Sequence, residues 1–258
     1  MYGLNAVALV FFCCINVTAY QLCKCPEDKR RNVVRCLCAV LLFGNLLRYG
    51  VVYPFVKGVV MLPVEFSTVA YFLVPAILLT SRKRLHSWAA YSGLMAGFFY
   101  YMAMIVAGGM IYGTNPPLDI YISMFCHGSI YFCGFVTIGT EVCSAKDAPK
   151  LALGVAWVAV RAAILRPYVV GSNWLLIYII LDAVAVKQVL PESTWTVALP
   201  VYYLAVAAFV LLTIRGFFRR NQKQYHMFHG GATAKGALII APEKVIVTTP
   251  GADNKKEL

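Results

Sequence analysis

The sequence predicts an all-α fold, a polytopic bundle of about seven membrane-spanning helices. Hydrophobic residues make up 60% of the 258 residues and charged residues only 13%, and the mean hydropathy is +0.71. A water-soluble domain of this size does not carry such values. The apolar residues form runs near the ~20 residues that a helix needs to cross about 30 Å of hydrocarbon. The basic residues stand in short clusters between these runs.

Seven apolar runs between the charged clusters qualify as spans. In chain order they cover residues 3–20, 33–53, 59–80, 88–112, 120–140, 151–170 and 195–214. The first lacks a charged n-region and a small-residue cleavage site, so we expect it to be retained as a span. The piece 173–186 is apolar but short and is interrupted by Asp182, which predicts an interfacial or re-entrant segment.

The orientation follows from lysine and arginine in the loops. The first, third and fifth loops and the start of the tail hold thirteen such residues, whereas the other three loops hold only Lys57 and Lys187. The positive-inside rule then predicts a lumenal or outside N-terminus and a cytosolic C-terminus. It divides the chain into a transmembrane domain, residues 1–214, and a basic, largely flexible cytosolic tail, residues 215–258. Basic loops of this kind face anionic lipid, and we expect no nucleic-acid partner.

The last four residues, KKEL, resemble the lumenal retrieval signal K-D-E-L, but a lumenal receptor cannot meet a cytosolic tail. On the cytosolic side Lys255 and Lys256 instead resemble the dilysine signal, by which coat machinery returns membrane proteins to the endoplasmic reticulum. The sequence therefore predicts the endoplasmic reticulum or another endomembrane as the location. An ordinary charged terminus is the alternative.

The nine cysteines do not predict a metal centre. Most lie inside or beside apolar runs, where cysteine behaves as a small hydrophobe. No C-x-x-C pair with zinc-finger spacing is present. We expect neither a metal ion nor a cofactor.

Two ionisable residues inside the spans share one predicted depth. Glu65 and His127 each lie about seven residues, or roughly 10 Å, from the lumenal ends of their spans. A charge at such depth costs about 2.5 to 3.5 kcal/mol and needs a partner. We therefore predict that both face one polar cavity in the lumenal half. Pro63 weakens the nearby backbone ladder, which is tolerated where helices line a cavity.

Arginines of two other spans lie at similar heights. Arg48 is in the second span, Arg161 and Arg166 are in the sixth, and Asn173 follows just outside. Their convergence on the same cavity is one interpretation. The alternative is that the arginines extend to the headgroups, and that a buried Glu/Arg or Glu/His pair only fixes the register of the helices.

Three stretches together carry a family resemblance: "LPVEFSTVAYFLVPAILLT", then "ISMFCHGSIYFCGFVTIG", then "GSNWLLIY". The arrangement resembles the YwaF-like family of multi-pass membrane proteins, over about residues 63–178. The resemblance implies a fold similar to the androgen-induced membrane hydrolases. It also implies acyl transfer between phospholipids, with a span cysteine as acyl carrier and a histidine as base.

Residue by residue, His127 matches the family histidine and Asn173 the family asparagine. Where the family has histidine and cysteine, this chain has "PVEFST". Ser67 or Thr68 would then replace the thiol, because a hydroxyl activated by an adjacent base attacks an ester. In this hypothesis Glu65 orients His127. Arg48, Arg161 and Arg166 would bind the phosphate headgroup.

The expected function is therefore a phospholipid acyltransferase or lipid hydrolase whose partners are membrane lipids. Two alternatives from other classes stay open. One is a non-catalytic subunit of a membrane complex, with its charged residues as clamps between helices or partner subunits. The other is a small proton-coupled transporter in which Glu65 and His127 relay the proton.

Overall fold

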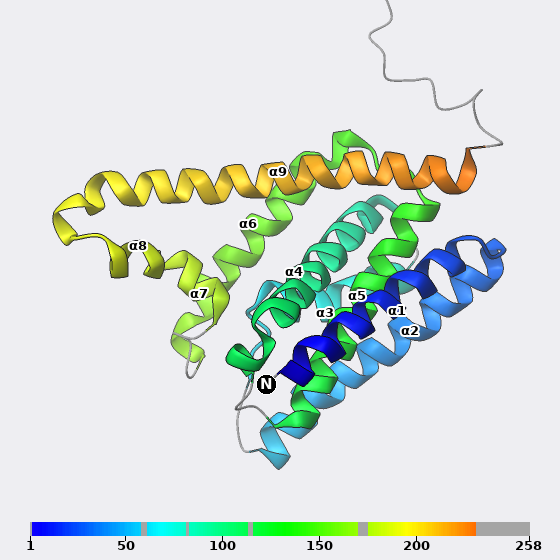
Figure 1. Ribbon diagram of the computed structural model, residues 1–258, viewed down its shortest axis with the longest axis horizontal. Helices are drawn as coiled ribbons and strands as arrows, with labels where there is room; N and C mark the ends of the chain where they lie inside the picture. Colours follow the sequence, from blue (N-terminus) through cyan, green and yellow to red (C-terminus); the bar gives the residue numbers. More distant parts are fainter. Residues whose placement is uncertain (1, 58–60, 81–82, 113–115, 170–174, 231–258) are drawn as a thin grey trace, which may run out of the picture. The chain divides into compact units, whose positions relative to one another are not determined.

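The computed structural model describes residues 2–57, 61–80, 83–112, 116–169 and 175–230 (Figure 1). Over these ranges the chain is helical and contains no strand. Six helical segments in this part of the chain are long and apolar enough to cross a membrane. The predicted all-α, multi-pass architecture is confirmed.

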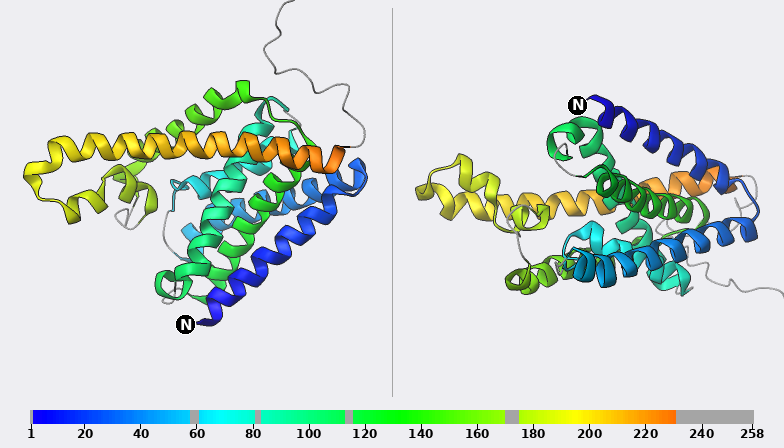
Figure 2. Two further views of the ribbon diagram at one scale, coloured as in Figure 1. Left: turned by 45° about the horizontal axis from the view of Figure 1, so that its top comes forward. Right: turned by 90° about the horizontal axis from the view of Figure 1, so that it is seen from below.

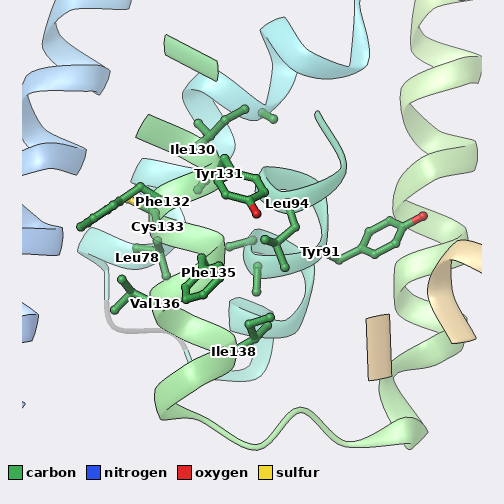
Figure 3. Close-up of a cluster of buried hydrophobic side chains, with 14 of the residues drawn as sticks. Leu78, Tyr91, Leu94, Ile130, Tyr131, Phe132, Cys133, Phe135, Val136 and Ile138 are labelled. Atoms are coloured by element: carbon green, nitrogen blue, oxygen red, sulfur yellow. The ribbon is translucent and has the colours of Figure 1, made fainter. Parts of the chain in front are cut away.

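Five consecutive helical elements form the central bundle (Figures 1 and 2). They are α1 (Tyr2–Cys23), α2 (Glu27–Leu47) with its π-helical continuation η1 (Arg48–Val56), α3 (Phe66–Leu79), α4 (His86–Tyr112) and α5 (Pro117–Thr140). The helix α5 is the most buried of them. Its apolar side chains fill the core between α3 and α4 (Figure 3).

Two glycines allow α4 and α5 to approach closely. A Cβ atom on Gly97 would lie 2.4 Å from the Tyr131 Cβ, and one on Gly93 would lie 2.4 Å from the Ile130 carbonyl oxygen. Real Cβ atoms do not occur at such distances from their neighbours. The α4–α5 pair is therefore a rigid frame against which the other helices pack.

The third predicted span is shorter in the structure than expected. Its helix α3 has 14 residues, about 21 Å of helix, and it starts only at Phe66 because residues 61–64 are irregular and Glu65 is extended. Pro63 explains the late start, since proline lacks an N–H group and disfavours helix at the preceding residue. The seven predicted spans thus become six long helical segments and one short helix.

The rest of the chain consists of α6 (Ala148–Leu165), the short α7 (Leu176–Leu181) and α8 (Val184–Val189), and the 35-residue α9 (Trp195–His229). Short 3-10 turns occur at Lys83–Leu85, Ala145–Asp147, Arg166–Tyr168 and Glu192–Thr194. The helix α9 continues past the predicted tail boundary at residue 215, because Phe217, Phe218 and Asn221 are buried against the bundle.

The C-terminal ends of α1, α5 and α9 lie together. A Cβ on Gly139 would lie 2.7 Å from the Cys23 sulfur and 3.2 Å from the Phe228 ring. Beside them, the Asn221 amide donates hydrogen bonds to the carbonyls of Ile138 (2.9 Å) and Glu141 (2.7 Å). This contact of α1, α5 and α9 is called the basic end below.

Candidate functional site

A groove of about 590 Å³ runs between α2 with η1 and the first half of α5. Its walls are mainly apolar, and several are open to the surroundings: Val40 is 59% exposed and Leu118 is 69% exposed. The groove is therefore open along an apolar edge.

One end of the groove carries three charged side chains. The Lys57 ammonium lies 3.0 Å from one carboxylate oxygen of Asp119, and the Arg48 guanidinium lies 3.9 Å from the other. Both cations also approach the Tyr53 ring, at 5.2 Å for Arg48 and 5.5 Å for Lys57. Two cations share one carboxylate, so this end has a local charge of +1.

The inner wall of the groove is a seam between α2 and α5. The Asn45 amide nitrogen lies 3.8 Å from the Cys126 sulfur, and both residues line the groove. Two turns away, the sulfurs of Cys38 and Cys133 are 3.7 Å apart. All four side chains are buried, which fixes the seam while the outer edge of the groove stays open.

His127 follows Cys126 on α5, but its ring lies in the protein interior. The ring stacks on Tyr100 of α4, with centroids 3.6 Å apart. Its Nδ1 is 2.9 Å from the Ser123 carbonyl oxygen and 2.6 Å from the Tyr71 hydroxyl, which also lies 3.0 Å from Nε2. Because the Ser123 carbonyl can only accept, it suits an imidazole that carries a proton on Nδ1.

The expected pairing of Glu65 with His127 is not found. The Glu65 carboxylate instead lies beside the backbone N–H groups of Leu176 and Ile177, at the start of α7. This arrangement satisfies N–H groups that have no partner inside α7. It became available because Glu65 precedes α3 in extended backbone instead of lying inside a spanning helix.

The expected acyl carriers are not hydrogen-bond partners of His127 either. The Thr68 hydroxyl donates to the Glu65 carbonyl oxygen, 2.9 Å away, within the first turn of α3. Ser67 is also in that first turn, and the His127 ring bonds to Tyr71 and Ser123. Tyr71 was not among the predicted site residues, although it lies one turn after Ser67 and shares its helix face.

Arg161 and Arg166 form hydrogen bonds to other residues of the protein. Arg161 donates to the carbonyl of Pro63, and Arg166 forms two hydrogen bonds with Asp182, of 2.6 and 2.5 Å. The guanidinium lowers the pKa of the Asp182 carboxyl by this bonding. Next to them the buried Tyr178 hydroxyl donates to the Ala162 carbonyl, 2.8 Å away.

These contacts form a second unit, which we call the clamp: Glu65, Arg161, Arg166, Tyr178 and Asp182. It ties the start of α3 to α6 and α7 over a small apolar cluster that includes Val64 and Ala162. Of the predicted headgroup arginines, only Arg48 lines the groove. Arg161 and Arg166 thus contact other segments of the chain and do not line the groove. The alternative interpretation of the charged residues stays a prediction.

The remaining predicted site residues, Asn173, Lys255 and Lys256, lie outside the described residues. In the part of the chain that the structure describes, no group of three histidine, cysteine or acidic side chains is placed to hold a metal ion.

The fold and the groove define a class: a multi-pass helical membrane protein with an open apolar groove that ends in a charged cluster. No family model matches the chain, and no characterised protein or solved structure shows significant similarity to it. The resemblance to the YwaF-like family thus stays a prediction.

Proposed function

We propose that the protein binds a lipid with an anionic phosphate headgroup in the groove between α2, η1 and α5. The headgroup lies at Arg48 and Lys57, and an acyl chain follows the apolar walls toward Asn45 and Cys126. One observation carries this proposal: an open apolar groove ends at two cations that share a single carboxylate.

Chemistry and size both support this ligand. Guanidinium offers N–H groups in a planar fork that fits phosphate oxygens, and phosphate adds the negative charge that balances the local +1. The volume of about 590 Å³ lies within the range of small-molecule sites in proteins. Burial of an acyl chain along the walls contributes about 0.8 kcal/mol per methylene group when it leaves water.

The test measures binding of short-chain phosphatidic acid to the purified protein in detergent. The double variant Arg48→Gln, Lys57→Gln is expected to bind at least about tenfold more weakly, because hydrogen bonds to charged groups are worth about 1.5 to 3 kcal/mol. Asp119→Asn is expected to bind more tightly, since it removes the competing carboxylate. Lys187→Gln, in α8, is the matched control and leaves binding unchanged.

Two further ligands test whether the phosphate group and the acyl chain are both needed for binding. Inorganic phosphate alone is expected to bind far more weakly than phosphatidic acid, because it lacks the acyl chain, and diacylglycerol is expected to bind weakly because it lacks the phosphate. Equal binding of phosphatidic acid by the double variant and the parent protein, or weaker binding by Asp119→Asn, would overturn the proposal.

Acyl transfer or lipid hydrolysis, which the family resemblance implies, stays a prediction. It depends on His127 as the base, and the side-chain hydroxyl nearest to the His127 ring nitrogens is that of Tyr71. In an assay of phospholipid turnover, His127→Ala would abolish such activity. The retrieval role of Lys255 and Lys256 and the endomembrane location likewise stay predictions.

A further inference from the structure

A second cavity lies at the basic end, beside the C-terminal half of α9. Its volume is about 1140 Å³, and its lining includes Arg219, Arg220 and Lys223 of α9 together with Phe135 of α5. No aspartate or glutamate lines it. The three cations therefore give this cavity a charge of +3, compared with +1 at the groove.

Among the described residues, no carboxylate forms an ion pair with these cations. The carboxylates that form ion pairs do so with other cations, such as Arg31, Lys57, Lys150 and Arg166. Glu141, the acidic residue at this end of α5, pairs with His86 at 2.8 Å. Within the described ranges, the positive charge of the cavity is therefore not balanced by an acidic side chain.

Arg220 is held in place before any ligand arrives. Its guanidinium carbon lies 5.8 Å from the centre of the Phe135 ring, within the range of cation–π attraction. Arg220 also lies near the Tyr131 side chain, whose hydroxyl donates to Asn16 of α1 at 2.9 Å. A guanidinium fixed from one side loses little conformational freedom when it binds an anion.

The setting selects a lipid rather than a soluble anion. The cavity belongs to the last turns of α9, a helix that is long and apolar enough to cross a membrane, and its basic residues follow the apolar part of that helix. Met227, 57% exposed, and the Phe135 ring supply apolar surface next to the cations. Basic clusters at the end of a spanning helix attract anionic lipids, at about 1 kcal/mol per basic residue.

We infer that this cavity binds the headgroup of an acidic lipid that carries more than one phosphate. Arg219, Arg220 and Lys223 lie within little more than one turn of α9. Three cations this close together can bind two phosphate groups at once. The site is separate from the groove, because the two cavities share no lining residue. It goes beyond the proposed function.

The experiment uses the full chain in detergent and compares dioctanoyl phosphatidylinositol bisphosphate with dioctanoyl phosphatidylserine. The bisphosphate lipid is expected to bind at least about tenfold more tightly, and Arg220→Gln, Lys223→Gln is expected to remove about tenfold or more of that affinity. The control is Arg215→Gln, an exposed arginine of the same helix that does not line the cavity. It is expected to change the affinity less than twofold.

The variant Arg220→Lys keeps the positive charge, so a loss of affinity in this variant is not explained by a folding defect from the loss of that charge. It is expected to lose part of the affinity, because an ammonium cannot bind phosphate through two parallel N–H groups. The double variant Arg48→Gln, Lys57→Gln is expected to leave this binding unchanged, so the proposal for the groove and the inference for this cavity are tested independently. Equal affinity for the two lipids, or an equal loss in Arg215→Gln, would overturn the inference.

Discussion

The groove and the clamp contain the same kinds of residue and use them differently. In the clamp each charge has a partner of its own: Arg166 binds Asp182, and the Glu65 carboxylate binds backbone N–H groups of α7. In the groove Arg48 and Lys57 share Asp119 beside an open apolar surface. The first region is closed and electrically balanced, whereas the second is open and positive.

This difference shows how to separate structural from ligand-binding charges in a membrane protein. An ionisable residue in a span needs a partner, but that partner is often the protein itself. Depth alone does not separate the cases, since Arg48, Arg161 and Arg166 lie at similar predicted heights. The charge left over after internal pairing, together with open volume, separates them.

The largest expected effect is in the clamp. Tyr178 is fully buried and its hydroxyl bonds the Ala162 carbonyl. Tyr178→Ala is expected to destabilise the protein by about 3 to 5 kcal/mol, as for other buried aromatic rings, without weakening phosphatidic acid binding by the folded fraction. Thermal unfolding and lipid binding in detergent check both parts. A stable variant with lost lipid binding would contradict the division into two regions.

An intermediate effect is expected from a substitution that fills the groove. Gly44 lines it, and a Cβ atom there would meet no other atom within 4 Å. Gly44→Phe is expected to weaken phosphatidic acid binding about tenfold, or about 1.4 kcal/mol, with little change in unfolding temperature. Gly50→Phe is the control, because Gly50 is equally open but does not line the groove. Similar losses in both variants would argue against the groove as the site.

The smallest effect is expected from Arg166→Gln. It removes a partly exposed ion pair, and such pairs add little stability. Because Arg166 lowers the pKa of Asp182, the pair stabilises the fold above the ordinary carboxyl pKa of about 3.9. That stabilisation is lost as the pH falls through the lower folded-state value. Unfolding temperatures of the two proteins should therefore converge in acid, and a difference that grows there would contradict this.

The sequence was sufficient for the helical class, because apolar runs separated by charges leave few other folds. It also located the unusual part of the third span, where Pro63 and Glu65 stand. It could not show that Glu65 caps α7, since that contact joins residues far apart in the chain. Nor could it show that α9 continues to His229, because the buried Phe217 and Phe218 lie beyond the first basic residue.

The candidate site was only partly predictable. Arg48 was expected near a cavity and does line the groove. His127 was expected to meet Glu65 and a hydroxyl of Ser67 or Thr68, but its ring meets Tyr71 and Tyr100. Which helix face turns toward a neighbour depends on packing. The non-helical backbone at residues 61–65 changes where α3 begins and thus which face α3 presents to α5.

The most direct measurement uses phosphatidic acid with a photoreactive diazirine in its acyl chain, incorporated with the protein into nanodiscs. After illumination, peptide mapping should place the label on α2 near residues 40–47 and on α5 near residues 118–126. Gly44→Phe should greatly reduce the label there, and Gly50→Phe should not. Labelling confined to α6 and α7, or labelling of α2 and α5 that Gly44→Phe leaves unchanged, would contradict the account.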